Sequence, residues 1–154
     1  MTALATLSRH LDHAAWANRE TLAALTRAPL HHPTRKLLAH VVATEFLWLD
    51  RLQATPPRHP VWPDWSLSET SAHAADLPAA WRAFLAGCGE AGLAHQVSYV
   101  NSRGQRWSTT VHDILTHVAL HGAHHRGQVA AELRRAGVDP PDLDFVHAAR
   151  TDQL

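Results

Sequence analysis

The stretch TVHDILTHVALHGAHHRGQVAAELRRAG, residues 110–137, carries five of the 14 histidines of the chain within one amphipathic pattern. Thr110 followed by Asp113 is typical of a helix N-terminus, because a threonine side chain there accepts a hydrogen bond from a free backbone N–H. Gly137 is typical of a helix end, where the backbone often turns left-handed. The stretch therefore predicts one long helix from about Thr110 to about Ala136.

Two histidines of this helix are spaced like metal ligands. With about 100° between successive residues, His121 and His125 fall on the same side as Ile114 and Val118, which marks the inward face. An i, i+4 pair of imidazoles places two ligand nitrogens one turn apart, as in zinc-binding helices. A metalloprotease is a poor interpretation, because Gly122 stands where the H-E-x-x-H motif has its catalytic glutamate.

A third ligand is expected from another helix. His40 lies at the edge of an apolar helical face, where an imidazole needs partners for its ring nitrogens. Alone, it would more often be a hydrogen-bonded core residue. Together with His121 and His125 it is interpreted as a ligand. Three protein ligands with one open position are typical of catalytic zinc sites rather than structural ones.

Several other side chains are candidates for the surroundings of this site. His117 lies one turn before His121 and is either a further ligand or a hydrogen-bonding neighbour. The remaining candidates are Gln128, on the same helical side, Trp48, which could line a pocket or belong to the core, and Asn18, the one polar residue in an apolar stripe. Arg126 is expected to point away from the inward face.

The ten other histidines show no ligand spacing and are expected on the surface or in the tail: His10, His13, His31, His32, His59, His73, His95, His112, His124 and His147.

Three more helices are predicted from the apolar spacing. They are expected at about 4–25, 34–54 and 67–91. Pro29 and Pro33 separate the first two, because proline excludes the preceding residue from the helical region. Pro78 predicts a kink or restart in the third, with Asp76 as a possible cap.

The other segments are not helical in pattern. Residues 55–66 hold four prolines and two tryptophans and are expected to form an ordered loop or lid. QVSYVN at 96–101 and QRWSTT at 105–110 predict a hairpin with Gly104 at positive φ. The tail carries Leu143, Phe145 and Val146, enough apolar surface to dock on the body. The whole predicts an all-α protein, a helical bundle with a small inserted β-hairpin, as one domain over residues 1–154.

Composition excludes several classes of function. The 154 residues carry 14 Lys and Arg against 14 Asp and Glu, so no basic excess indicates nucleic-acid binding. No apolar stretch reaches the length of a membrane span, about 20 residues. The single Cys88 cannot form an intramolecular disulfide, and no signal peptide is recognisable. We therefore expect a cytoplasmic protein.

The chain resembles the DinB (YfiT-like) family of metal-dependent proteins. The resemblance rests on WAN at 16–18, LLAHVVATEFLWLDRL at 37–52, YVNSRGQRWS at 99–108, THVALHGAHHRGQV at 116–129 and PDLDFV at 141–146. Membership implies an up-down-down-up four-helix bundle, usually a dimer, in which three histidines hold a divalent cation. These correspond to His40, His121 and His125. Some relatives use a low-molecular-weight thiol such as mycothiol or bacillithiol as cosubstrate.

Two hypotheses for function follow. In the first, a three-histidine centre activates a low-molecular-weight thiol or water for an S-transferase, isomerase or hydrolase reaction on a small molecule. In the second, the protein is a non-catalytic dimeric stress-response or ligand-binding module with a structural metal. Three imidazoles suit zinc, nickel or iron, so the sequence leaves the metal open.

Overall fold

The computed structural model describes residues 1–28 and 32–154, with the backbone alone for residues 32 and 33. The break expected at Pro29 lies outside these residues. The described elements are α1 (Ala3–Arg27), α2 (His32–Leu52), α3 (Leu67–Gly92), β1 (Gln96–Val100), β2 (Arg106–Thr110), α4 (Val111–Arg135) and α5 (Phe145–Arg150).

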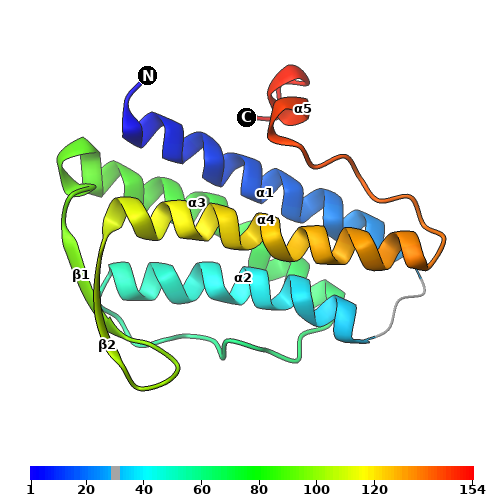
Figure 1. Ribbon diagram of the computed structural model, residues 1–154, viewed down its shortest axis with the longest axis horizontal. Coiled ribbons are helices and arrows are strands. Elements are labelled where there is room, and N and C mark those ends of the chain that lie inside the picture. The colour runs from blue at the N-terminus through cyan, green and yellow to red at the C-terminus, as the bar shows by residue number, and fades with distance from the viewer. Residues whose placement is uncertain (29–31) are drawn as a thin grey trace.

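The four long helices form an up-down-down-up bundle (Figure 1). α1 and α4 run in one direction and α2 and α3 in the other, as the colour sequence shows. α1 packs mainly against α3 and α4, and α2 packs mainly against the same two helices. A simple up-and-down bundle would instead place α1 beside α2. The predicted all-α bundle with an inserted hairpin is therefore confirmed.

Side-chain caps set where the long helices begin. Thr110 caps α4 by accepting a hydrogen bond from the backbone N–H of Asp113, as predicted. Ser66 and Glu69 form a reciprocal capping box at the start of α3. At the other end of α4, Gly137 adopts a φ of 75°, which favours glycine. These contacts satisfy backbone groups that have no partner inside a helix.

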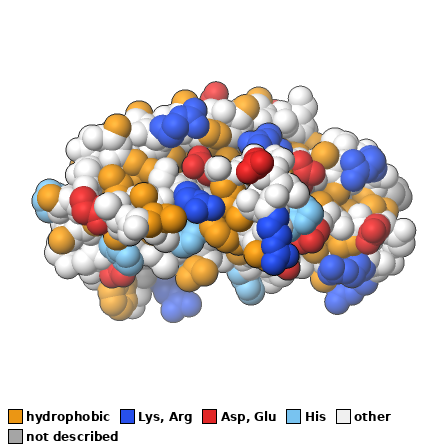
Figure 2. Space-filling view, turned by 90° about the horizontal axis from the view of Figure 1, so that it is seen from above, with side chains coloured by type: hydrophobic (Ala, Val, Ile, Leu, Met, Phe, Trp, Pro, Cys, Tyr) orange, Lys and Arg blue, Asp and Glu red, His pale blue; other side chains and the backbone are white. Residues whose placement is uncertain are grey.

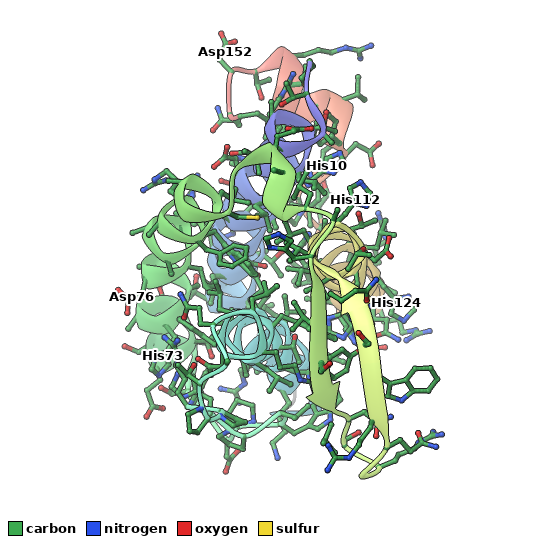
Figure 3. All side chains as sticks on the ribbon, turned by 90° about the vertical axis from the view of Figure 1, so that its left-hand side faces the viewer. His10, His73, Asp76, His112, His124 and Asp152 are labelled. Atoms are coloured by element: carbon green, nitrogen blue, oxygen red, sulfur yellow. The ribbon has the colours of Figure 1, made fainter. Side chains whose placement is uncertain are left out.

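The break predicted in the third helix is wrong in position. α3 runs through Pro78, and Asp76 is an exposed residue on the outer side of the helix rather than a cap (Figure 3). Leu77 and Trp81 are buried on either side of the proline, and this packing holds the helix together there. The backbone departs from helical geometry at Gly89 instead, with φ 62°.

α2 begins at His32, two residues before the predicted start, so Pro33 falls in its first turn, where proline is tolerated. After α2, residues 53–66 cross back along the bundle to the start of α3 (Figure 1). We call these residues the crossover loop. Buried Asp50 anchors it by accepting hydrogen bonds from the backbone N–H and guanidinium of Arg58.

The core lies between the four helices. Most of the apolar stripe predicted for the first helix is buried, including Leu7, Leu11 and Leu25. A smaller cluster places Leu143 and Ala148 of the tail against Trp16 of α1. The predicted docking of the tail holds for Leu143, whereas Val146 is half exposed.

The hairpin lies at one end of the bundle, beside the C-terminal end of α2 and the start of α4 (Figure 1). β1 and β2 are antiparallel, with Gln96 opposite Thr110 and Val100 opposite Arg106. Gly104 in the turn has a φ of 75°, as the sequence predicts. No helix in the described residues is long and apolar enough to cross a membrane.

The outer surface carries charges of both signs. On the face above α1 and α5, basic side chains are interspersed with aspartate and glutamate (Figure 2). This distribution matches the equal numbers of basic and acidic residues in the sequence.

Candidate metal centre

Three histidines from two helices converge at one point between α2 and α4. The Nε2 atom of His121 lies 3.3 Å from Nε2 of His40 and 3.2 Å from Nε2 of His125. One ligand atom from each of the three residues fits within 4.8 Å of the others. We call these residues the histidine trio.

The second ring nitrogen of each histidine faces an oxygen. Nδ1 of His40 lies 2.8 Å from the carbonyl oxygen of Val61, and Nδ1 of His125 lies 2.7 Å from the amide oxygen of Gln128. Because these oxygens only accept, the two Nδ1 atoms carry the hydrogen. The neutral rings then present bare Nε2 lone pairs to the centre, the form that binds a metal.

His121 has a weaker partner of the same kind. Its Nδ1 lies 3.5 Å from the hydroxyl oxygen of Thr44. That hydroxyl donates to the backbone carbonyls of His40 and Val41, which leaves its oxygen free to accept. The same tautomer is therefore favoured in all three rings.

Regular helix geometry explains why these side chains meet. His40 and Thr44 are four residues apart on α2 and lie on one face. His121 and His125 have the same relation on α4, and α2 packs against α4 in the opposite direction. The crossover loop adds the carbonyl of Val61 from outside the helix pair.

The surroundings keep His121 and His40 uncharged at neutral pH. Burial, followed by the neighbouring rings of His125 and His40, lowers the pKa of His121 to about 4. Burial also lowers the pKa of His40 below its usual value, against the opposing hydrogen bond to Val61. Neutral imidazoles are the ligand form, so no proton has to leave His121 before it binds a cation at neutral pH.

The spacing of the trio fits a tetrahedral cation. A zinc–nitrogen distance of about 2.0–2.1 Å and a tetrahedral angle place two ligand nitrogens about 3.3–3.4 Å apart. The two Nε2 separations at His121, 3.3 and 3.2 Å, are close to this value. Lone pairs that face one another at this distance repel unless a cation lies between them. The donor set therefore suits a divalent metal ion.

The crossover loop covers one ligand. The indole of Trp62 stacks on the imidazole of His40, with ring centroids 3.7 Å apart and planes 6° apart. The same indole lies edge-on to His125 at 6.4 Å. Trp62 is nevertheless 53 % exposed, so it is a wall of the site rather than part of the core.

Two of the four predicted neighbours contact the trio, and a third contacts one of these neighbours. Gln128 accepts from His125, and the ring of His117 lies 5.3 Å from that of His121. Trp48 contacts His117 edge-on at 5.3 Å, on the side toward the hairpin.

Asn18, the fourth neighbour, belongs to a separate buried network. Its amide nitrogen donates to Glu45, and its amide oxygen accepts from Arg126. The indole N–H of Trp81 donates to the other carboxylate oxygen of Glu45. Asn18 thus links a buried carboxylate to a buried guanidinium, and no described contact joins it to the trio.

The expected outward direction of Arg126 is wrong. The side chain is 2 % exposed, because α4 packs against α1 as well as α2 and Arg126 faces α1. Its Nη2 atom is buried without a hydrogen-bond partner. Burial lowers the pKa of this guanidinium to about 10, whereas the charge of Glu45 raises it.

Some of the remaining histidines are exposed, as predicted, and others are partly buried. His124 lies on the outer side of α4 (Figure 3), as predicted. His13 is instead half-buried and hydrogen-bonds the carbonyl of Leu143. His59 and His73 pack against one another in an aromatic cluster under the crossover loop. His31 and the side chain of His32 lie outside the described residues.

The sequence matches the DinB family over residues 1–153. The chain belongs to the DinB family. The family resemblance noted in its motifs is thereby confirmed for essentially the whole length. None of the curated proteins compared matches the chain significantly. Family membership and the convergence of His40, His121 and His125 are independent observations that agree on a metal site.

Proposed function

We propose that this DinB-family protein is a metal-dependent enzyme whose histidine trio holds a divalent ion, zinc, nickel or iron. The observation that carries this proposal is the convergence of three Nε2 atoms, each on a ring whose other nitrogen faces an oxygen acceptor. Neutral histidines leave the ion its full double charge, which is the property a Lewis-acid centre needs.

The chain's own residues hold and orient the ligands. Val61 and Gln128 fix the ring orientation of His40 and His125, and Trp62 shields one face of His40. His121 and His125 are only partly buried, so a small molecule can approach the site from solvent. A bound divalent ion would lower the pKa of a thiol or water molecule bound to it. The deprotonated molecule would then be a nucleophile at neutral pH.

A thiol cosubstrate is favoured over water. Among the described residues, the ring nitrogens of the trio contact only a carbonyl, an amide oxygen, a hydroxyl and one another. Hydrolysis usually needs a carboxylate or histidine base to activate water, whereas a thiol ionises more readily. The proposed reaction is therefore transfer or isomerisation with a low-molecular-weight thiol, on a small-molecule substrate.

The setting of the protein is part of the proposal. A cytoplasmic location, where thiol cosubstrates stay reduced, is proposed with the enzyme, and the single cysteine is consistent with it. A homodimer is proposed by analogy with the family. Nucleic-acid binding is not proposed, because basic and acidic residues balance.

A structural metal is the competing function. His40 comes from α2 and His121 and His125 from α4, so one ion would cross-link two helices. A non-catalytic module of this kind would lose stability with the metal but would bind no thiol or small anion at it.

Elemental analysis of untagged protein tests whether the trio binds a metal ion. Wild type is compared with His125→Ala and with His124→Ala, which removes a neighbouring histidine that faces outward. We expect about one divalent ion per chain in wild type and in His124→Ala, and loss of the ion in His125→Ala.

Thiol titration of the metal-loaded protein then separates the two functions. Binding of a small thiol that depends on the metal supports the enzyme. Metal-dependent stability without thiol or anion binding supports the structural module. Failure of the wild type to bind zinc, nickel, iron or manganese after reconstitution would overturn both, and the trio would then be a hydrogen-bonded core.

A further inference from the structure

A partly buried cation, Arg51, lies on α2 farther along the helix from the trio. Arg51 is three helical turns after His40 on the same face of α2, about 16 Å along the helix axis. A long helical side chain leans toward the helix N-terminus, which brings the guanidinium back toward His40. The guanidinium contacts the ring of Trp48, and Trp48 in turn contacts His117, the neighbour of His121.

Arg51 is held rigidly by its neighbours. Its guanidinium carbon lies 4.5 Å from the ring centroid of Trp48 and 4.6 Å from that of Tyr99. One Nη2 hydrogen bond goes to the carbonyl oxygen of Val100 in the hairpin. These contacts fix the position of the group but involve only part of its five N–H donors.

No acidic side chain neutralises Arg51 within the described residues. The ion pairs there involve Lys36, Arg58 and Arg135 or histidines, and none includes Arg51. Burial lowers the pKa of its guanidinium below the usual value, against an opposing contribution from the Tyr99 phenol. A fixed, partly desolvated cation without a carboxylate partner is suited to bind an anionic ligand.

We propose that Arg51 is an anion-binding residue and that the small molecule used at the metal centre carries a carboxylate or another acidic group. The rings of Trp48 and His117 connect Arg51 to His121 through successive contacts, and His117 is exposed. A substrate or thiol cosubstrate would place its acidic group at Arg51 and its reacting group at the trio. This inference rests on the proposed metal function and adds the charge class of the ligand.

The test measures thiol binding to cobalt-loaded protein by absorption titration. The probes are ω-mercaptocarboxylates from mercaptoacetate to 6-mercaptohexanoate, each compared with its neutral methyl ester. In wild type we expect acids long enough to reach Arg51 to bind on the order of tenfold more tightly than their esters, the range for a charge-assisted hydrogen bond. The shortest acid should show little preference.

Two substitutions at Arg51 isolate its charge. Arg51→Gln removes the charge but keeps a donor for Val100, and Arg51→Met keeps only the aliphatic stem. Both should bind acid and ester equally, with ester affinity and metal content unchanged. Arg51→Lys should retain part of the preference. Arg106→Met removes an exposed charge from the same hairpin and should keep the wild-type preference.

The outcomes separate this inference from the metal function. Equal binding of acids and esters by metal-loaded wild type, or an unchanged preference in both Arg51→Gln and Arg51→Met, would overturn the role of Arg51 while leaving the metal centre intact. A loss as large in Arg106→Met would show a general field of positive charge and would also overturn it. Absence of metal from wild type would instead remove the proposed function itself.

Discussion

The indole of Trp62 lies flat on the imidazole of His40, with ring centroids 3.7 Å apart and an angle of 6° between the planes. The adjacent Val61 accepts a hydrogen bond from Nδ1 of the same imidazole. The crossover loop thus contacts one edge and one face of the His40 ring, although His40 itself belongs to α2. The loop therefore takes part in orienting a candidate ligand.

Replacing Trp62 with leucine should weaken metal binding. The stacked indole restricts rotation of the His40 ring, and contacts that orient a ligand are worth about 10–100-fold in metal affinity when lost. We expect a loss near the lower end, on the order of tenfold, because the Val61 hydrogen bond remains. Competition with a chromophoric zinc chelator measures the affinity.

Trp107→Leu is the matched control for this change. Trp107 is 55 % exposed, close to the 53 % of Trp62, but it lies on β2 of the hairpin. Its loss should leave metal affinity within experimental error of wild type. Equal affinities in wild type and Trp62→Leu would show that α2 alone orients His40.

Gln128→Leu should weaken the metal site through His125. The amide oxygen of Gln128 lies 2.7 Å from Nδ1 of His125, and leucine offers no acceptor. We expect a 10–100-fold weaker metal affinity, of the order found when such outer hydrogen bonds are removed. Gln128→Glu keeps an acceptor and should bind metal at least as tightly as wild type.

The control for Gln128 lies one turn further along α4. Glu132→Gln changes a side chain that pairs with Arg135 rather than with the trio, so metal affinity should not change. A Gln128→Leu protein that binds metal as tightly as wild type would mean that packing, not the amide oxygen, holds the ring of His125.

The trio could be predicted from sequence because helix geometry is regular. Residues four apart share a face in any helix, so His121 and His125 had to point the same way once the helix was recognised. Periodicity places His40 on an apolar helical face, but which helix that face meets is a tertiary property. The family resemblance supplied that pairing, and the structure brings the three rings together.

The burial of Arg126 could not be predicted from the helical pattern. A helical wheel defines one inward direction, but α4 packs against both α1 and α2, so a second side of the helix is also buried. The contact of Trp62 with His40 could not be predicted from the sequence either, because residues 53–66 have no periodic pattern that indicates the path of the loop. Both features depend on the packing of segments distant in sequence.

Removal of Arg126 should destabilise the metal-free protein. Arg126→Met leaves the carboxylate of Glu45 buried without a cation and the amide oxygen of Asn18 without its donor. Breaking a buried charge pair from one side costs about 3–5 kcal/mol. Arg126 and Glu45 are linked through Asn18 rather than by a direct ion pair, so we expect the lower end of that range, about 3 kcal/mol at pH 7. Urea unfolding measures the loss. Arg134→Met, an exposed change on the same helix, should stay within about 0.5 kcal/mol of wild type.

The cost of Arg126→Met should grow as pH rises. Burial raises the pKa of Glu45 above its usual value, against hydrogen bonds from Trp81 and Asn18 and the charge of Arg126. The native protein then holds this proton more tightly than the unfolded chain does. The stability that Glu45 contributes is therefore complete below its unfolded pKa, about 4.3, and is lost as pH rises through its native pKa.

Without Arg126 the native pKa of Glu45 rises further, which extends this loss to higher pH. The difference in unfolding free energy between wild type and Arg126→Met should thus be smaller at pH 5 than at pH 8. Paired urea titrations at the two values measure it in the presence of a chelator. A difference that shrinks with rising pH would show that the charge of Arg126 does not act on Glu45.

Two glycines of α4 should respond oppositely to alanine. A Cβ atom on Gly122 would lie 2.7 Å from Nη1 of Arg126, whereas one on Gly127 would meet nothing within 4 Å. Gly127→Ala should stabilise the protein by about 0.5–1 kcal/mol, because alanine is the better helix former. Gly122→Ala should destabilise it by about 1–3 kcal/mol, because Arg126 is buried and tied to Asn18 and cannot easily move away.

The double variant Gly122→Ala/Arg126→Met identifies the cause of the Gly122 effect. If the guanidinium is what excludes a side chain at Gly122, the double variant should be more stable than the sum of the two single losses, because the collision is gone. Thermal and urea unfolding of the four proteins measure this coupling. Strict additivity, or stabilisation by Gly122→Ala alone, would mean that Arg126 shifts freely and that the glycine is not required by its packing.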